Sequence, residues 1–309
     1  MSPGLVPTCG SGTPCADGAS PLAGAERRRH HGGMAVSMMK QMMAALPQLR
    51  YQPTTKRIRV RLGDTVAADT TRAMLIWEPM RIVPSYAVPQ ADFSAELQPA
   101  PPAPEPEYQS VRFGADPARL LDPSVPFAVH TAEGEPLAVR TADAVREGAG
   151  FRLSDPELGG YVVLDFDAFD WWEEDEPIVG HPRDPFHRID VRQSSRRVRL
   201  EHHGIVLADS DRGRWLFEGT FPMVRYYLPT EDVRVELRPT ELRTTCAYKG
   251  HATHYTAVFA DQELANIAWS YQEPLPDAAE VAGLVCFYQE RLDLFLDGEA
   301  VERVHTPWS

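Results

Sequence analysis

Residues 57–100 read RIRVRLGDTVAADTTRAMLIWEPMRIVPSYAVPQADFSAELQPA, and residues 197–240 read RVRLEHHGIVLADSDRGRWLFEGTFPMVRYYLPTEDVRVELRPT. Without a gap, at a constant offset of 140, the two stretches share 13 identical residues in 44 positions. These are Arg57/Arg197, Arg59/Arg199, Val66/Val206, Ala68/Ala208, Asp69/Asp209, Arg72/Arg212, Glu78/Glu218, Tyr86/Tyr226, Pro89/Pro229, Asp92/Asp232, Glu96/Glu236, Leu97/Leu237 and Pro99/Pro239. Self-similarity of this length at a fixed offset is the signature of a repeated structural unit, so the chain contains one module twice.

A second block of similarity extends the repeat toward the end of each copy. Residues 160–162 (GYV) align with residues 283–285 (GLV) at an offset of 123. Because the offset falls by 17, the first copy carries extra residues between the two blocks. We place them near the Pro-rich stretch 98–106, since proline cannot donate a hydrogen bond to a strand ladder.

The sequence pattern within each copy is that of β-strands. Residues 197–201, 224–228 and 233–237 are short runs rich in β-branched and aromatic residues, with local alternation, and turn residues separate them. Helical turns are expected at residues 276–281 and at residues 141–147. The predicted fold class is therefore mainly β, with two tandem small modules from internal duplication and few short helices.

The domain organisation follows from the repeat. Residues 1–50 are expected to form a disordered leader, in which a Met-rich segment could make one or two helical turns and Met34 is an alternative start. Residues 51–190 form the first, degenerate copy with its Pro-rich insertion and a bridge, and residues 191–309 form the second, complete copy. A chain of 309 residues that is 43% hydrophobic is long enough for about two such domains.

Composition restricts the expected partners and compartment. The 31 Lys and Arg residues against 44 Asp and Glu give a net charge of -13, which would repel a phosphate backbone and argues against nucleic acid as a partner. Four cysteines do not make a disulfide framework, and no apolar run approaches the roughly 20 residues that span a bilayer. We expect a cytoplasmic protein that does not bind membranes; its oligomeric state stays open.

Four ordered motifs of the second copy carry a resemblance to a known family. They are YYLPTEDV (226–233), TCAYKG (245–250), AWSY (268–271) and GLVCFY (283–288), and the bridge GHPRDPFHR (180–188) precedes them. The chain resembles the domain of unknown function family 427 from about residue 51 to its end, as a tandem two-copy member. The resemblance implies small β-tent-like modules, similar in shape to ligand-binding domains such as that of cereblon, and it carries a nucleotidyltransferase label. The sequence departs from the family at Ala247, where proline is usual, and the first copy lacks the Cys-x-x-Lys-Gly and Trp-Ser-Tyr motifs.

The polar-tipped aromatic residues of the second copy are the candidate ligand-binding residues. Such side chains stack on a small ligand and orient it, although aromatics at alternating strand positions also pack in cores. We expect an unidentified small molecule to bind through an aromatic, lysine and cysteine pocket in the second copy. The predicted site residues are Tyr227, Cys246, Lys249, Tyr255, Trp269 and Tyr271.

Two alternative readings of the same region leave catalysis open. A cation at Lys249 would lower the pKa of the Cys246 thiol and make it a nucleophile, but a half-buried structural cysteine fits the same residues. Asp165 and Asp167 could hold Mg²⁺ for nucleotidyl transfer, as the family label suggests, or belong to a strand followed by an acidic solvated turn. An interaction scaffold is a third hypothesis.

No metal site and no cofactor are assigned from the sequence. Cys246, His251 and His254 lie close together, but a spacing of three places the two histidines on opposite faces of a regular strand. His181 and His187 are interpreted as bridge residues that dock the two copies. The strings that mark phosphate loops, dinucleotide-binding folds and serine hydrolases do not occur in a strand-to-helix setting.

Overall fold

The computed structural model describes residues 35–101, 110–112, 119–219, 223–260, 262–304 and 306. Residues 1–34, which include most of the predicted leader and the alternative start at Met34, lie outside the described residues. The described chain begins with the short helix α1 (Met38–Ala44), in the Met-rich segment where helical turns are predicted. Within the described ranges, every helix is too short or too polar to cross a membrane.

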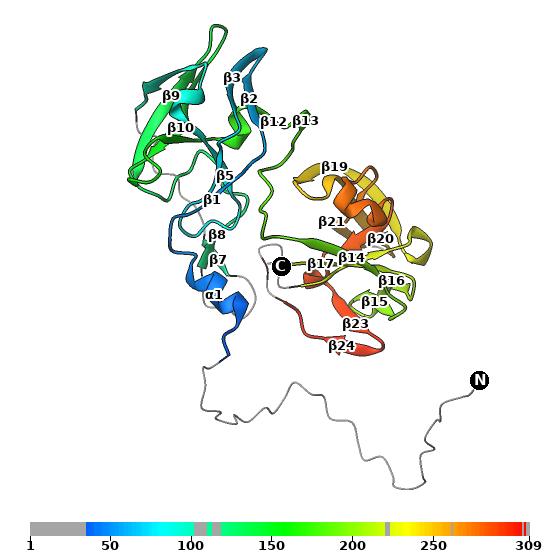
Figure 1. Ribbon diagram of the computed structural model, residues 1–309. Helices are drawn as coiled ribbons and strands as arrows, with labels where there is room; N and C mark the ends of the chain where they lie inside the picture. Colours follow the sequence, from blue (N-terminus) through cyan, green and yellow to red (C-terminus); the bar gives the residue numbers. More distant parts are fainter. Residues whose placement is uncertain are drawn as a thin grey trace, which may run out of the picture. The chain divides into compact units, whose positions relative to one another are not determined.

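The first module contains two antiparallel sheets (Figure 1). The larger sheet has the order β1-β4-β5-β11-β10-β9-β6 and consists of β1 (Arg50–Pro53), β4 (Met74–Trp77), β5 (Ser85–Pro89), β6 (Glu96–Pro99), β9 (Gly134–Arg140), β10 (Val145–Leu153) and β11 (Tyr161–Leu164). The smaller sheet has the order β13-β12-β2-β3 and consists of β2 (Ile58–Leu62), β3 (Thr65–Thr70), β12 (Asp170–Glu173) and β13 (Glu176–Pro177). A separate two-stranded sheet pairs β7 (Ser110–Arg112) with β8 (Arg119–Leu121).

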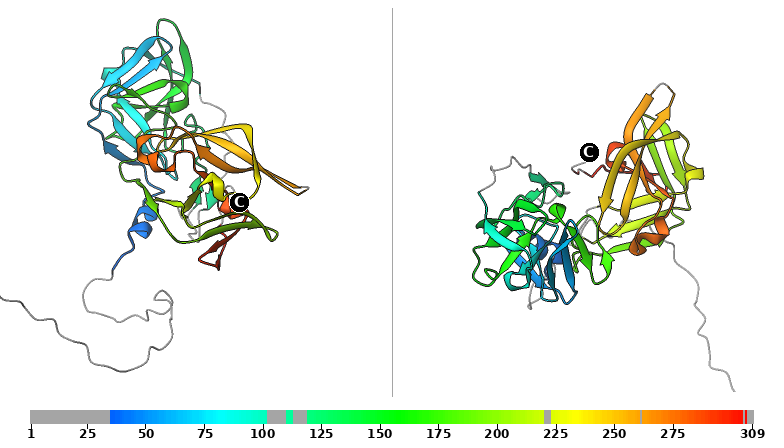
Figure 2. Two further views of the ribbon diagram at one scale, coloured as in Figure 1. Left: turned by 90° about the vertical axis from the view of Figure 1, so that its right-hand side faces the viewer. Right: turned by 90° about the horizontal axis from the view of Figure 1, so that it is seen from above.

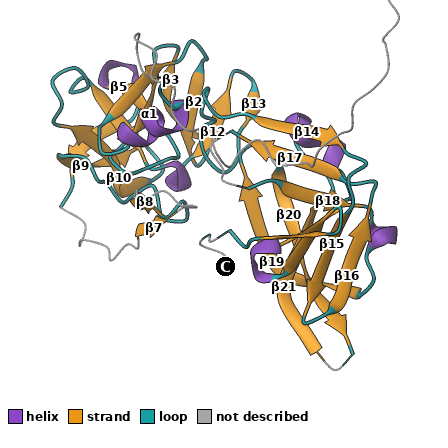
Figure 3. Ribbon diagram, turned by 90° about the horizontal axis from the view of Figure 1, so that it is seen from below, coloured by secondary structure: helices purple, strands orange, loops and turns teal. Residues whose placement is uncertain are grey.

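The second module repeats both sheets strand for strand (Figure 3). Its larger sheet has the order β14-β17-β18-β22-β21-β20-β19 and consists of β14 (Ile189–Gln193), β17 (Arg214–Glu218), β18 (Arg225–Leu228), β19 (Glu236–Cys246), β20 (Gly250–Phe259), β21 (Gln262–Tyr271) and β22 (Val285–Phe287). Its smaller sheet has the order β16-β15-β23-β24 and consists of β15 (Val198–His202), β16 (Ile205–Ser210), β23 (Asp293–Leu296) and β24 (Glu299–Val301). The mainly β fold class is confirmed, and the first copy, degenerate in its motifs, keeps the whole strand order.

Short 3-10 helices join the strands in both modules, at equivalent places except for η4 (Pro276–Val281), which in the described residues occurs in the second module alone. They are η1 (Gln90–Asp92), η2 (Phe166–Ala168), η3 (Thr230–Asp232), η4 (Pro276–Val281) and η5 (Gln289–Arg291). The helical turn predicted at residues 276–281 is therefore confirmed. The helical turn predicted at residues 141–147 is wrong, because Thr141 and Ala144 close a tight turn and β10 already begins at Val145.

The extra chain of the first copy lies between β6 and β9, a longer stretch than the Pro-rich segment alone. It carries β7 and β8, whereas in the second module β19 runs directly into β20 through a tight turn. The second module instead has longer strands here: β19, β20 and β21 have 11, 10 and 10 residues and lie side by side, in yellow to orange (Figure 2). These three strands form the walls of the candidate site.

The larger sheet of the second module is buried on both faces. Ala268, Val285 and Phe287 belong to the core between the two sheets, together with Val198 and Leu200 of β15. The opposite face carries a second core, to which η4 contributes Ala278 and Val281. Its other members include Leu216, Tyr227, Trp269, Tyr271 and Cys286. Alternate residues of one strand therefore enter different cores.

Candidate functional site

A cavity of about 290 Å³ opens on the face of the larger sheet that looks toward the smaller sheet. Its nine lining residues come from η3, from β19 and the chain leading into it, and from β20 to β22 with the chain that joins β21 to β22: Thr230, Val233, Val235, Leu237, Tyr255, Ser270, Gln272, Gly283 and Val285. The volume is at the lower end of the range for small-molecule sites. None of the nine side chains carries a charge.

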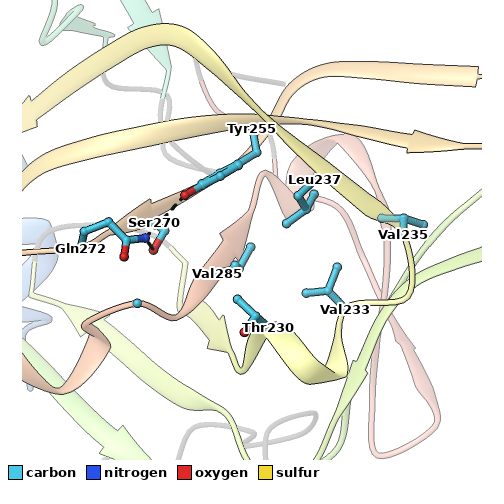
Figure 4. Close-up of a pocket in the computed structure, with 9 residues that line it drawn as sticks. Thr230, Val233, Val235, Leu237, Tyr255, Ser270, Gln272 and Val285 are labelled. Carbon is cyan, nitrogen blue, oxygen red and sulfur yellow. Dashed lines mark hydrogen bonds between the residues drawn. The ribbon is translucent and has the colours of Figure 1, made fainter.

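The cavity has a polar end and an apolar end (Figure 4). The tips of Tyr255, Ser270 and Gln272 gather on the left of the view, and the valine and leucine side chains fill its centre and right. The amide nitrogen of Gln272 donates to Ser270 Oγ at 3.1 Å and to the Tyr255 hydroxyl at 3.5 Å. Ser270 is only 1% exposed, so its hydroxyl is placed by the strand, whereas Gln272 lies at the exposed rim.

Of the six predicted site residues, Tyr255 alone lines this cavity, and the register of the strands explains why. Tyr255 pairs with Ala268 and Ser270 pairs with Val285, so these side chains share the face toward the smaller sheet. Trp269 pairs with Cys286 and Tyr227 pairs with Cys286 from the other side, so these three share the opposite face. Five of the six predicted residues lie on or beside that opposite face, and Tyr255 is separated from them by the sheet.

The first module places different side chains at the equivalent positions. Phe93 stands where the second copy has Val233, at the offset of 140. Leu137 pairs with Pro99 as Tyr255 pairs with Pro239, and Arg152 pairs with Val162 as Ser270 pairs with Val285. The first copy therefore lacks the tyrosine and serine hydroxyls and has a bulkier side chain at the apolar end.

On the opposite face, Lys249 forms an ion pair with Glu218. The ammonium lies 2.5 Å from Glu218 Oε1, and the two side chains are 10% and 15% exposed. Burial disfavours the charged lysine, but the charge of Glu218 and its hydrogen bond outweigh burial and raise the pKa of Lys249. Glu78, the equivalent carboxylate of the first copy, accepts hydrogen bonds from the backbone of Thr131 and Ala132 and contacts His130. In both copies the repeated glutamate thus holds the chain just before an equivalent strand, β9 in the first copy and β20 in the second.

The bridge packs on the turn that contains Lys249. The Tyr248 hydroxyl accepts a hydrogen bond from the backbone nitrogen of Asp184 at 2.8 Å, and Arg183 Nε donates to the Ala247 carbonyl at 2.9 Å. The rings of His181 and His187 lie 5.9 and 4.6 Å from the Tyr248 ring. His187 Nε2 also lies 3.7 Å from Glu218 Oε2. Both bridge histidines therefore contact the second module.

A hydrogen bond joins two of the buried aromatic residues of the opposite face. Trp269 Nε1 donates to the Tyr227 hydroxyl at 3.3 Å, and Tyr227 is fully buried. Burial raises the pKa of Tyr227 and Tyr271 well above the ordinary tyrosine value. Burial also raises the pKa of the Cys286 thiol to about 12. Cys246 is half-buried at the end of β19, and it is a free thiol.

The residues weighed for metal binding lie apart. His251 is exposed and hydrogen-bonds Thr245, while His254 is buried on the other face of β20 with Nε2 2.8 Å from Thr244 Oγ1. Asp165 caps η2 by accepting the backbone N–H of Asp167. Across the described ranges, no group of three or more His, Cys, Asp and Glu side chains is arranged to hold a metal ion.

Sequence reasoning missed eight of the nine cavity residues. Ser270 lies inside the Trp-Ser-Tyr motif, but the aromatic residues on either side of it drew the functional interpretation. Val233, Val235 and Leu237 show the alternation of a half-buried strand, which looks the same for a core and for a cavity wall. The signal that could have found Ser270 is alternation within one strand: Trp269 and Tyr271 share one face of the sheet, so Ser270 between them points to the other face.

Among the comparisons with known proteins, one family model matches part of the chain. No curated protein matches the chain. The match to a family covers one copy of the module, and the first copy has the same strand order without such a match. Residues 190–298 match the model of the family NTP_transf_9, described as a domain of unknown function (DUF427).

Proposed function

We propose that the second module binds a small, uncharged molecule in the cavity between β19–β22 and η3. The observation that carries this proposal is the cavity itself, with apolar walls and a few convergent polar groups at one end, which is the usual make-up of a small-molecule site. Its position in the module that matches the family supports the same assignment.

The lining favours a neutral ligand over a nucleotide. None of the nine lining residues is charged, so a phosphate group would find no cation there to replace its water. Lys249, the one cation among the predicted site residues, is paired with Glu218 on the opposite face. A nucleotide-transferring role therefore receives less support from this cavity than a binding role.

The other five predicted residues fit a structural role in this proposal. Tyr227, Trp269 and Tyr271 are buried with their rings in contact, and Lys249 and Glu218 neutralise each other beneath the bridge. A scaffold role would need an exposed aromatic patch. In the described part of the second module, Phe217 is the one aromatic side chain exposed by as much as 41%.

A thermal-shift screen with neutral aromatic and aliphatic fragments tests the proposed function on the full chain. A ligand at 100 times its Kd stabilises the folded state by about 2.7 kcal/mol, so hits should raise the Tm by several degrees. Val233→Phe introduces the residue of the first copy and should fill the cavity and abolish the shift. Val66→Phe makes the same change at an exposed strand position of the first module and should leave it intact. Hits that stabilise Val233→Phe as much as the parent would place binding elsewhere, and a screen without hits would contradict the proposal.

A further inference from the structure

At the polar end of the cavity, one amide group donates hydrogen bonds to two hydroxyl groups. Gln272 Nε2 carries two hydrogens and donates to two hydroxyl oxygens, those of Ser270 and Tyr255. Each hydroxyl therefore uses its oxygen as an acceptor and keeps its own hydrogen. Among the described residues, no acceptor takes either hydroxyl hydrogen.

These two hydrogens are available to a ligand. Ser270 and Tyr255 both line the cavity, and their tips lie next to each other in Figure 4. Ser270 is almost completely buried, and a buried donor without an acceptor is unfavourable, so the arrangement is completed when something accepts from it. A carbonyl oxygen has two lone pairs and can accept from two donors at once.

We propose that Ser270 and Tyr255, oriented by Gln272, bind the carbonyl oxygen of a neutral ligand. This inference rests on the proposed function and names the ligand class: an uncharged ketone, ester or amide whose hydrocarbon part packs on Val233, Leu237 and Val285. Gln272 is a positioning residue, because it fixes the direction of the two hydroxyls. The first copy, with Leu137 and Arg152 at the two hydroxyl positions, lacks this pair of donors.

A pair of isosteric probes tests the carbonyl requirement. Acetophenone and α-methylstyrene differ in one group, C=O against C=CH₂, and have nearly the same shape and volume. In titrations of the full chain followed by NMR, acetophenone should bind at least tenfold more tightly, because only it accepts from both hydroxyls. Equal affinity of the two probes would overturn the carbonyl assignment but leave the cavity as a binding site. Failure of both probes, together with a thermal-shift screen without hits, would overturn the proposed function itself.

A variant at Gln272 tests the role of its amide. Gln272→Glu replaces the donor by a carboxylate that only accepts, so the Ser270 and Tyr255 hydrogens turn toward it and away from the cavity. The preference for acetophenone should fall to near onefold, with the affinity for α-methylstyrene unchanged. Gln193→Glu, an exposed position on β14, is the matched control and should keep the tenfold preference. Tyr255→Phe should reduce the preference while it keeps the ring; an undiminished preference in both Gln272→Glu and Tyr255→Phe would overturn the inference.

Discussion

Several residues that are identical between the two copies form the same ion pairs. Arginine and aspartate pair in the first copy as Arg57–Asp69 and Arg72–Asp92, and in the second copy as Arg197–Asp209 and Arg212–Asp232. Asp92 and Asp232 also accept a hydroxyl hydrogen bond, from Thr70 and Ser210, at 2.6 Å in both copies. These hydrogen bonds and charges lower the pKa of both aspartates. The identities that reveal the duplication thus include these ion pairs, whereas the cavity combines residues that both copies share, such as Leu237, with residues that differ, such as Val233.

On the opposite face, the ion pair between Arg225 and Glu290 is almost completely buried, so we expect it to matter most for stability. The guanidinium lies 2.7 and 3.0 Å from the two carboxylate oxygens, with side chains 6% and 0% exposed. Arg225→Met should lower the free energy of unfolding by about 3–5 kcal/mol, because it leaves a buried carboxylate uncompensated. Urea unfolding measures this change.

An exposed pair and a double variant serve as controls for Arg225. Arg238→Met breaks pairs whose side chains are more than half exposed and should cost less than about 1 kcal/mol. Arg225→Met combined with Glu290→Leu should recover much of the lost stability, since no charge then stays buried alone. If the double variant loses as much free energy of unfolding as the two single variants added together, the unpaired buried charge is not the cause of the instability of Arg225→Met.

At the scale of elements, the sequence predicts the strands well and their register poorly. The alternation of apolar and polar residues locates β15, where Val198 and Leu200 are buried and Arg199 is exposed. The residues that share a face of one strand can be read from that strand alone. Which face of β20 meets which face of β21 depends on bulges, such as the register shift between Tyr255 and Ala257, and these are set by contacts distant in sequence. The sequence therefore led to a set of predicted site residues that combines both faces of the larger sheet of the second module.

The bridge gives the second module a pH-dependent contact at His181. Burial, helped by the charges of His187, Arg183 and Lys249 and opposed by the Pro182 carbonyl, lowers the pKa of His181 to about 4. The unfolded chain has an ordinary histidine pKa near 6.5, so between about pH 6.5 and 4 it binds a proton that the folded chain does not. This group should therefore reduce stability as the pH falls through that interval, by at most about 1.4 kcal/mol per pH unit.

Unfolding midpoints in urea between pH 4 and 7 test this prediction. His181→Phe keeps an aromatic ring against Tyr248 and His181→Gln removes it, but neither side chain titrates. Both variants should show a flatter pH dependence than the parent across the interval. A slope in both variants equal to that of the parent would assign the proton uptake to other groups.

For the whole molecule, the buried apolar residues divide according to the duplication. Two core clusters contain only residues between Ile58 and Trp171, and two contain only residues between Ile189 and Leu294. Every strand of the two sheets in the second module also lies between Ile189 and Val301. Each copy therefore has its own two sheets and its own core clusters.

We predict that residues 178–309, the bridge with the second module, fold without the first copy. This fragment keeps all eleven strands of its two sheets and both of their cores, so it should unfold cooperatively in urea. The buried Trp215 and Trp269 should give it a near-UV circular dichroism signal. Residues 211–309, which lack β14, β15 and β16, are the control and should not fold, because Val198, Leu200 and Leu207 leave the core with those strands. A fragment 178–309 without a cooperative transition would show that the second copy depends on the first for its stability, and the duplication would then be one folding unit instead of two.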